Sequence, residues 1–144
     1  MFKKLKVVLD FSRLYVLLLL FDLELSKKGF TKTFEKYSVK YFNNTPNNHI
    51  SQNVVEDMES FFLLLNIVCA WYPKKADCIH KTLIGYKIMH KKFALPVEMV
   101  IGVRKFPFEA HAWLRINHEN LFPEEATNHY KIIISSHSYV KEQQ

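Results

Sequence analysis

Apolar side chains recur at helical spacing over the first 25 residues of the chain. They fall three or four positions apart between Phe2 and Leu25, as they do along one face of a helix. Gly29 fits the position just past the end of such a helix, and a short second helix is expected from Thr31 to Tyr41. This pattern predicts a helical N-terminal region that packs on the rest of the protein.

The middle of the chain reads as two further helices. Residues 43–48, with four asparagines, one threonine and one proline, predict a loop. A helix is expected to start near Ser51 or Asn53 and to run to Trp71, with Asn53 and Glu56 at capping-box spacing. The next helix is expected from Cys78 to Phe93, with Asp77 as its N-cap.

The last third of the chain changes to strand-like patterns. Three strands are expected at Val97–Val103, Phe108–Ile116 and Tyr130–Ser135, with a turn at residues 117–120. Helices followed by consecutive strands predict an α+β fold with an antiparallel sheet. The organisation we expect is an N-terminal helical region over residues 1–48, a core over 49–137 and a loose tail over 138–144.

Composition narrows the class of protein. A chain of 144 residues with 49% apolar and 24% charged residues is expected to form one globular domain and is not typical of disorder. The net charge of +6 is compatible with an acidic peptide, a membrane surface or nucleic acid, and selects none of them. The motifs typical of phosphate, dinucleotide or nucleic-acid binding are missing, so we predict no cofactor, no metal and no nucleic-acid partner.

The N-terminus resembles a targeting signal only in part. Lysines precede an apolar run from Leu14 to Phe21, but eight residues are too few to cross a bilayer, and charged residues follow in place of a cleavage site. We expect a helix packed on the core, with a peripheral membrane contact as the alternative. The expected compartment is the cytoplasm, where both cysteines would be free thiols.

Cys78 and His111 are the candidate reactive residues. Cys78 follows an N-cap, and the first turn of a helix stabilises a thiolate, whereas Cys69 lies mid-helix among apolar residues as a buried thiol would. His111 lies mid-strand between two alanines. A cysteine at a helix start and a histidine on a later strand are the arrangement of papain-like and transglutaminase-like enzymes.

A third group would orient the imidazole of the histidine, and it should follow soon after His111 in the chain. Spacing leaves several candidates open: Asn117, Glu119, Asn120, Glu124 and Glu125.

Several short stretches together resemble a known family, the lasso-peptide leader peptidases, which are transglutaminase-like cysteine proteases. The resemblance covers roughly residues 70 to 135, and the chain is similar to the stand-alone form that has no leader-binding domain. The stretches are Ala76-Asp77-Cys78-Ile79, Leu83-Ile84, Leu95-Pro96, Val100-Ile101-Gly102-Val103 and Phe108-Glu109-Ala110-His111-Ala112-Trp113-Leu114.

The resemblance implies a function and a set of partners. It makes Cys78 the nucleophile and His111 the base of an endopeptidase that removes the leader of a ribosomally made lasso-peptide precursor. The family's acid falls near Pro123 of this chain, so Glu124 is the preferred substitute. The implied partners are the precursor peptide, a separate leader-recognition protein and an ATP-dependent macrolactam-forming cyclase. The alternatives are an acyl transferase with the same residues, a non-catalytic peptide-binding member, and a basic module that binds membranes or nucleic acid.

Overall fold

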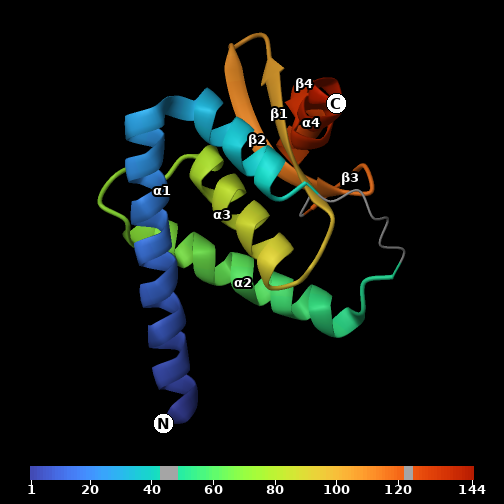
Figure 1. Ribbon diagram of the computed structural model, residues 1–144. Coiled ribbons are helices and arrows are strands. Elements are labelled where there is room, and N and C mark those ends of the chain that lie inside the picture. Colours follow the sequence, from blue (N-terminus) through green and yellow to red (C-terminus); the bar gives the residue numbers. More distant parts are fainter. Residues whose placement is uncertain (43–48, 122–124) are drawn as a thin grey trace.

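The computed structural model describes residues 1–42, 49–121 and 125–144. Three helices come first: α1 (Phe2–Lys40), α2 (Gln52–Trp71) and α3 (Cys78–Lys91). They are followed by the strands β1 (Val97–Arg104), β2 (Glu109–Ile116), β3 (Glu119–Asn120) and β4 (Lys131–Ser135), with a 3-10 helix at Glu125–His129 before β4 and α4 (Ser136–Gln143) at the end. Figure 1 shows α1, α2 and α3 gathered beside the sheet. The predicted α+β class is confirmed.

The sheet has the order β3-β2-β1-β4, and every pairing in it is antiparallel. Helix α3 packs tightly on it, because a Cβ atom added to Gly85 would lie 2.8 Å from Cδ1 of Leu114 on β2. Buried residues of α3 and β1 form the centre of the core: Leu83, Ile84, Tyr86, Met89, Val97 and Met99. This packing fixes the start of α3 relative to β2.

Helix α1 bends at Gly29, where the sequence predicts a helix end. Gly29 has φ 78° and ψ 169°, a backbone conformation open to glycine and closed to most other residues. Glu24 joins the two limbs on either side of the bend, accepting hydrogen bonds from Lys36 Nζ at 2.6 Å and from Tyr37 Oη at 2.8 Å. Burial raises the pKa of the Glu24 carboxyl, but these bonds and one from Lys28 outweigh it and lower the pKa to about 2.

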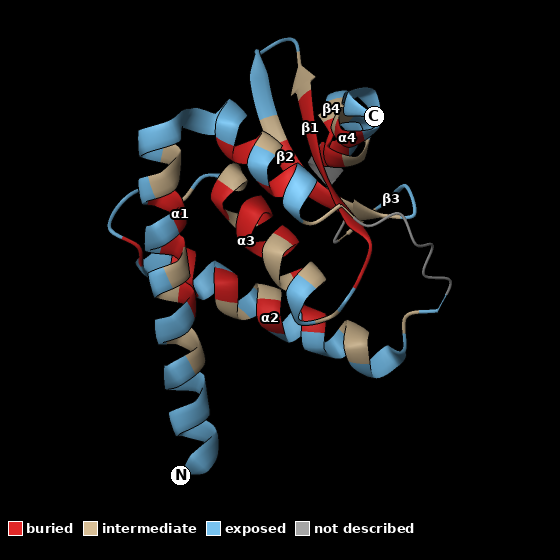
Figure 2. Ribbon diagram, in the orientation of Figure 1, coloured by how far each residue is buried: buried red, intermediate tan, exposed pale blue. Residues whose placement is uncertain are grey.

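Three details differ from the sequence-based expectation. The first limb of α1 packs on the core through Leu14, Leu18 and Phe21, whereas the regularly spaced apolar residues nearer the N-terminus are exposed (Figure 2). Helix α2 begins at Gln52 after Ser51, so Asn53 lies inside its first turn and is not its cap. The residues predicted to form a loose tail fold into α4, because Val140 is buried and the ring of Tyr139 packs at 6.3 Å from that of Phe34.

Candidate active site

Cys78 is the first residue of α3, as the sequence predicts. Asp77 is the N-cap with an extended backbone (φ −74°, ψ 168°), and Pro73 keeps the preceding segment out of the helical conformation. The Cys78 thiol is free and half-buried. Its sulfur therefore lies where the unpaired backbone N–H groups of the first helical turn can stabilise negative charge. The second thiol, Cys69, is buried in α2, and burial raises its pKa.

A buried polar cluster secures the start of α3 from behind. Asp77 N–H donates to Nδ1 of His80 at 3.1 Å, so Nδ1 is the acceptor and the ring proton lies on Nε2. That Nε2–H donates to Oδ1 of Asp22 on α1, also at 3.1 Å. The other carboxylate oxygen of Asp22 accepts from Tyr72 Oη at 2.9 Å and Lys74 Nζ at 3.1 Å. The first turn of α3 is thus tied to α1.

Charge and burial act in opposite directions on the carboxylate of this cluster. The hydrogen bond from Lys74 lowers the pKa of Asp22 against the effect of burial, with further help from Tyr72 and His80. Burial raises the pKa of Tyr72 to about 12, so its hydroxyl remains a donor at neutral pH. Sequence reasoning does not predict this cluster, because Asp22 and His80 are 58 positions apart and each has the pattern of an ordinary helical residue.

His111 lies in the middle of β2, opposite Gly102 of β1. Its ring stacks on Trp113 with 5.8 Å between ring centroids, and lies 5.4 Å from the ring of Tyr130. Gly102 makes room for this aromatic group, because a Cβ atom there would lie 2.7 Å from Cη2 of Trp113. The imidazole consequently contacts two aromatic rings that also lie near each other, and these contacts restrict its rotation.

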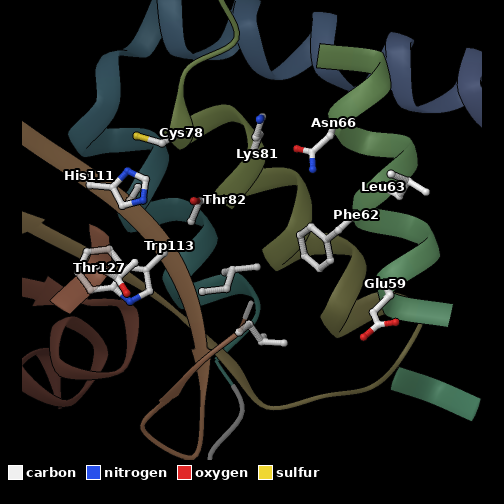
Figure 3. A pocket seen from close by; sticks show the side chains of 13 residues that line it. Glu59, Phe62, Leu63, Asn66, Cys78, Lys81, Thr82, His111, Trp113 and Thr127 are labelled. Atoms are coloured by element: carbon white, nitrogen blue, oxygen red, sulfur yellow. The ribbon is translucent and has the colours of Figure 1, made fainter. Parts of the chain in front are cut away.

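Cys78 and His111 line one pocket of about 350 Å³. Figure 3 shows the sulfur of Cys78 beside the ring of His111. Helices α2 and α3 form the other wall of the pocket with apolar and polar groups: Glu59, Phe62, Leu63, Asn66, Lys81 and Thr82. The structure therefore brings together the two residues that the sequence selects. The mixed lining suits a peptide, which has both apolar side chains and a polar backbone.

Of the candidates for the group that orients His111, the side chains of two are not described and two lie away from its ring. Glu124 lies outside the described residues, as does the side chain of Glu125, whose backbone belongs to the 3-10 helix. Asn117 lies just past the far end of β2, six residues or roughly 20 Å from His111 at ordinary strand rise. Glu119 is exposed and pairs with Ile116, which places its side chain on the opposite face of β2 from His111.

Asn120 supports the site indirectly, through Trp113. Its Oδ1 accepts a hydrogen bond from Nε1 of Trp113 at 2.8 Å, and its Nδ2 donates to Oγ1 of Thr127 at 3.2 Å. The amide thus fixes the indole on which His111 stacks. The sequence places residues 117–120 in a turn, whereas the structure shortens that turn to Asn117 and His118, both with positive φ, and pairs β3 with β2.

Comparison with known proteins places this chain in a family. No curated protein and no solved structure matches the chain. A family model described as the transglutaminase-like superfamily matches residues 25–135, a stretch that includes both Cys78 and His111. That superfamily includes cysteine proteases and acyl transferases. A match over more than half of the chain, with a cysteine at a helix start and a histidine on the adjoining sheet, shows that the protein belongs to the transglutaminase-like superfamily.

Proposed function

We propose that the protein is a cysteine endopeptidase that removes the leader from a ribosomally made lasso-peptide precursor. The observation that carries the proposal is the shared pocket of Cys78 and His111, at the start of a helix and on the adjoining sheet. The family match supports cysteine-dependent acyl chemistry in general. The choice of a lasso-peptide precursor rests on the sequence resemblance around Cys78 and His111.

In the proposed reaction, the imidazole of His111 takes the proton of the Cys78 thiol. The thiolate attacks the scissile carbonyl carbon, and the backbone N–H groups of the first turn of α3 stabilise the resulting oxyanion. When the C–N bond breaks, the imidazolium returns its proton to the leaving amine and a thioester remains on Cys78. Water, deprotonated by His111, then hydrolyses the thioester and restores the thiol.

The proposed setting is the one that the resemblance implies. The substrate is a precursor peptide brought by a separate leader-recognition protein, and the product passes to an ATP-dependent cyclase that forms the macrolactam. We place these steps in the cytoplasm, a compartment that suits two free thiols.

The test is cleavage of a candidate precursor by the full chain together with its leader-recognition protein, followed by mass spectrometry. Cys78→Ala and His111→Ala should each lower the rate by several orders of magnitude, because each removes one member of a unit that acts together. Cys69→Ala is the matched control, since it removes a thiol outside the pocket. Cleavage at a similar rate by the Cys78→Ala protein would overturn the proposal.

Acyl transfer to an amine is the second candidate, favoured by the same superfamily match. Both reactions proceed through the Cys78 thioester and differ in what attacks it. With hydroxylamine added as the amine nucleophile, a transferase should convert the substrate mainly into the hydroxamate and release the Cys78 thiol, whereas a protease should still release mainly the acid. Iodoacetamide labelling tests the third alternative, a non-catalytic binding protein, in which Cys78 would react no faster than Cys69.

A further inference from the structure

The first limb of α1 carries an apolar face that nothing in the described protein covers. We call this face the outward stripe. Its apolar members have exposed fractions between 41% for Leu19 and 90% for Phe2. They are Phe2, Leu5, Val8, Leu9, Val16, Leu19, Leu20 and Leu23, with Ser12 between them. At 1.5 Å per residue the stripe is about 32 Å long.

The opposite face of the same limb is already used by the core. Leu14, Leu18 and Phe21 are buried there, so the helix is apolar on both sides. A helix on the surface of a globular protein ordinarily turns a polar face to water. Figure 2 shows the buried inner face of α1 and its exposed outer face, which is directed away from α2 and α3. The outward stripe is therefore a surface that an apolar partner can cover.

Charge identifies the kind of partner. No stripe position up to Leu23 is charged, and this part of α1 is described throughout. Up to Leu23, the cations of the limb are Lys3, Lys4, Lys6 and Arg13, all exposed. The acidic residues of the same stretch are Asp10, whose Oδ1 lies 3.8 Å from Nη1 of Arg13, and the buried Asp22. The exposed charge is thus strongly positive beside an uncharged apolar surface, which is the composition of helices that lie in anionic membrane interfaces.

The width of the stripe favours a bilayer over a second helix. At 100° per residue its members spread over an arc of about 120°, wider than the narrow seam of a helix pair. Ser12 also falls in the middle of the stripe, where a helix pair would need an apolar side chain. A second copy packed antiparallel along the whole stripe would further bring the Arg13 side chains of the two copies together, because the middle of the stripe lies between Ser12 and Arg13. None of these objections to a helix as the partner applies to a planar, anionic lipid surface.

We propose that the outward stripe holds the protein in the plane of an anionic bilayer. The part of the chain that the structure describes has no helix long and apolar enough to cross a membrane, so the contact lies along the surface. The first limb of α1 lies on the headgroup region with its leucines directed into the acyl chains and its cations among the phosphates. Helices α2 and α3 lie on the other side of α1, away from the lipid (Figure 1).

The test is sedimentation of the full chain with vesicles of phosphatidylcholine alone or with one quarter phosphatidylglycerol. We expect binding to the anionic vesicles and weak binding to the neutral ones. The double variant Leu9→Gln and Leu20→Gln should lower the partition coefficient about tenfold or more, because it removes apolar contact at two exposed positions. The double variant Lys6→Glu and Arg13→Glu should also weaken binding, as should raising the salt to about 0.5 M.

Ile133→Gln is the matched control, because Ile133 on β4 is 59% exposed and far from α1 in sequence. Circular dichroism checks that each variant is folded. Three results would overturn the proposal: no binding to anionic vesicles, equal loss of binding with Ile133→Gln, or sedimentation velocity showing a dimer that the leucine variant dissociates. Peptide cleavage in solution is a separate readout, so failure here leaves the proposed function untouched.

Discussion

Replacing Asp22 with alanine should loosen the start of the helix that carries Cys78. The substitution removes the acceptor of two buried donors, His80 Nε2–H and Tyr72 O–H. Each buried donor left unpaired costs roughly 1–3 kcal/mol. Lys74 is different, because its side chain is 66% exposed and can turn to water, so its lost ion pair adds less than about 1 kcal/mol. We expect a total loss of about 3 kcal/mol in the free energy of unfolding.

Urea denaturation of the wild type and the Asp22→Ala protein measures this loss. Asp10→Ala is the matched control, because Asp10 lies on the same limb of α1 and, among the described residues, its carboxylate pairs only with the exposed Arg13, at 3.8 Å. It should cost less than about 0.5 kcal/mol. The rate of Cys78 alkylation in the folded state gives a second readout, which should change with Asp22→Ala and stay constant with Asp10→Ala.

One result would refute the reasoning. If Asp22→Ala destabilises the protein no more than Asp10→Ala, the donors of His80 and Tyr72 find other partners and the cluster does not secure α3. A Lys74→Ala protein separates the effect of the Lys74–Asp22 ion pair from that of the hydrogen bonds donated by His80 and Tyr72. Its free energy of unfolding should fall by less than about 1 kcal/mol. A loss with Lys74→Ala as large as that with Asp22→Ala would assign the stability to the ion pair.

The remaining predictions concern the bend of α1, the aromatic group and the third catalytic group. Glu24→Gln should cost about 1–2 kcal/mol at neutral pH. Since the pKa of Glu24 is lowered from 4.5 to about 2, the wild type itself loses this stability as the pH falls from about 4.5 towards about 2, and the urea midpoints of the two proteins should converge only near about pH 2. Gly102→Ala should cost about 1–3 kcal/mol and shift tryptophan fluorescence, because the new Cβ displaces Trp113; an unchanged spectrum would contradict this. Glu124→Gln should slow precursor cleavage at least about tenfold and Glu125→Gln should change it little; the reverse would place the register one residue off.

Local signals in the sequence predicted most of the fold. Asp77 before an apolar helix, proline after it, and alternation along β2 are all short-range features, and the helix start and the strand carrying His111 lie where those features place them. The pairing of Cys78 with His111 in one pocket also agrees with their order in the chain.

What the sequence could not supply depends on contacts between distant residues. A periodic apolar pattern predicts α1 but does not say which of two apolar faces meets the core, and the packing of Leu14, Leu18 and Phe21 decides it. The short segment after His137 is predicted to be loose from its sequence, and the packing of Tyr139 on Phe34 is what places it in α4. The role of Asn120 as a support for Trp113 likewise follows only from the pairing of β3 with β2.

The anchoring of α3 by Asp22 has a consequence for comparing relatives. The family match begins at residue 25, so the carboxylate that ties down the cysteine helix belongs to a part of the chain upstream of the shared region. Deleting residues 1–24 would therefore remove the hydrogen bond from His80 to Asp22 and take Leu18 and Phe21 out of the core, while Cys78 and His111 would remain in the chain. Matching the two reactive residues alone therefore does not carry over the contact that holds the cysteine helix in this protein.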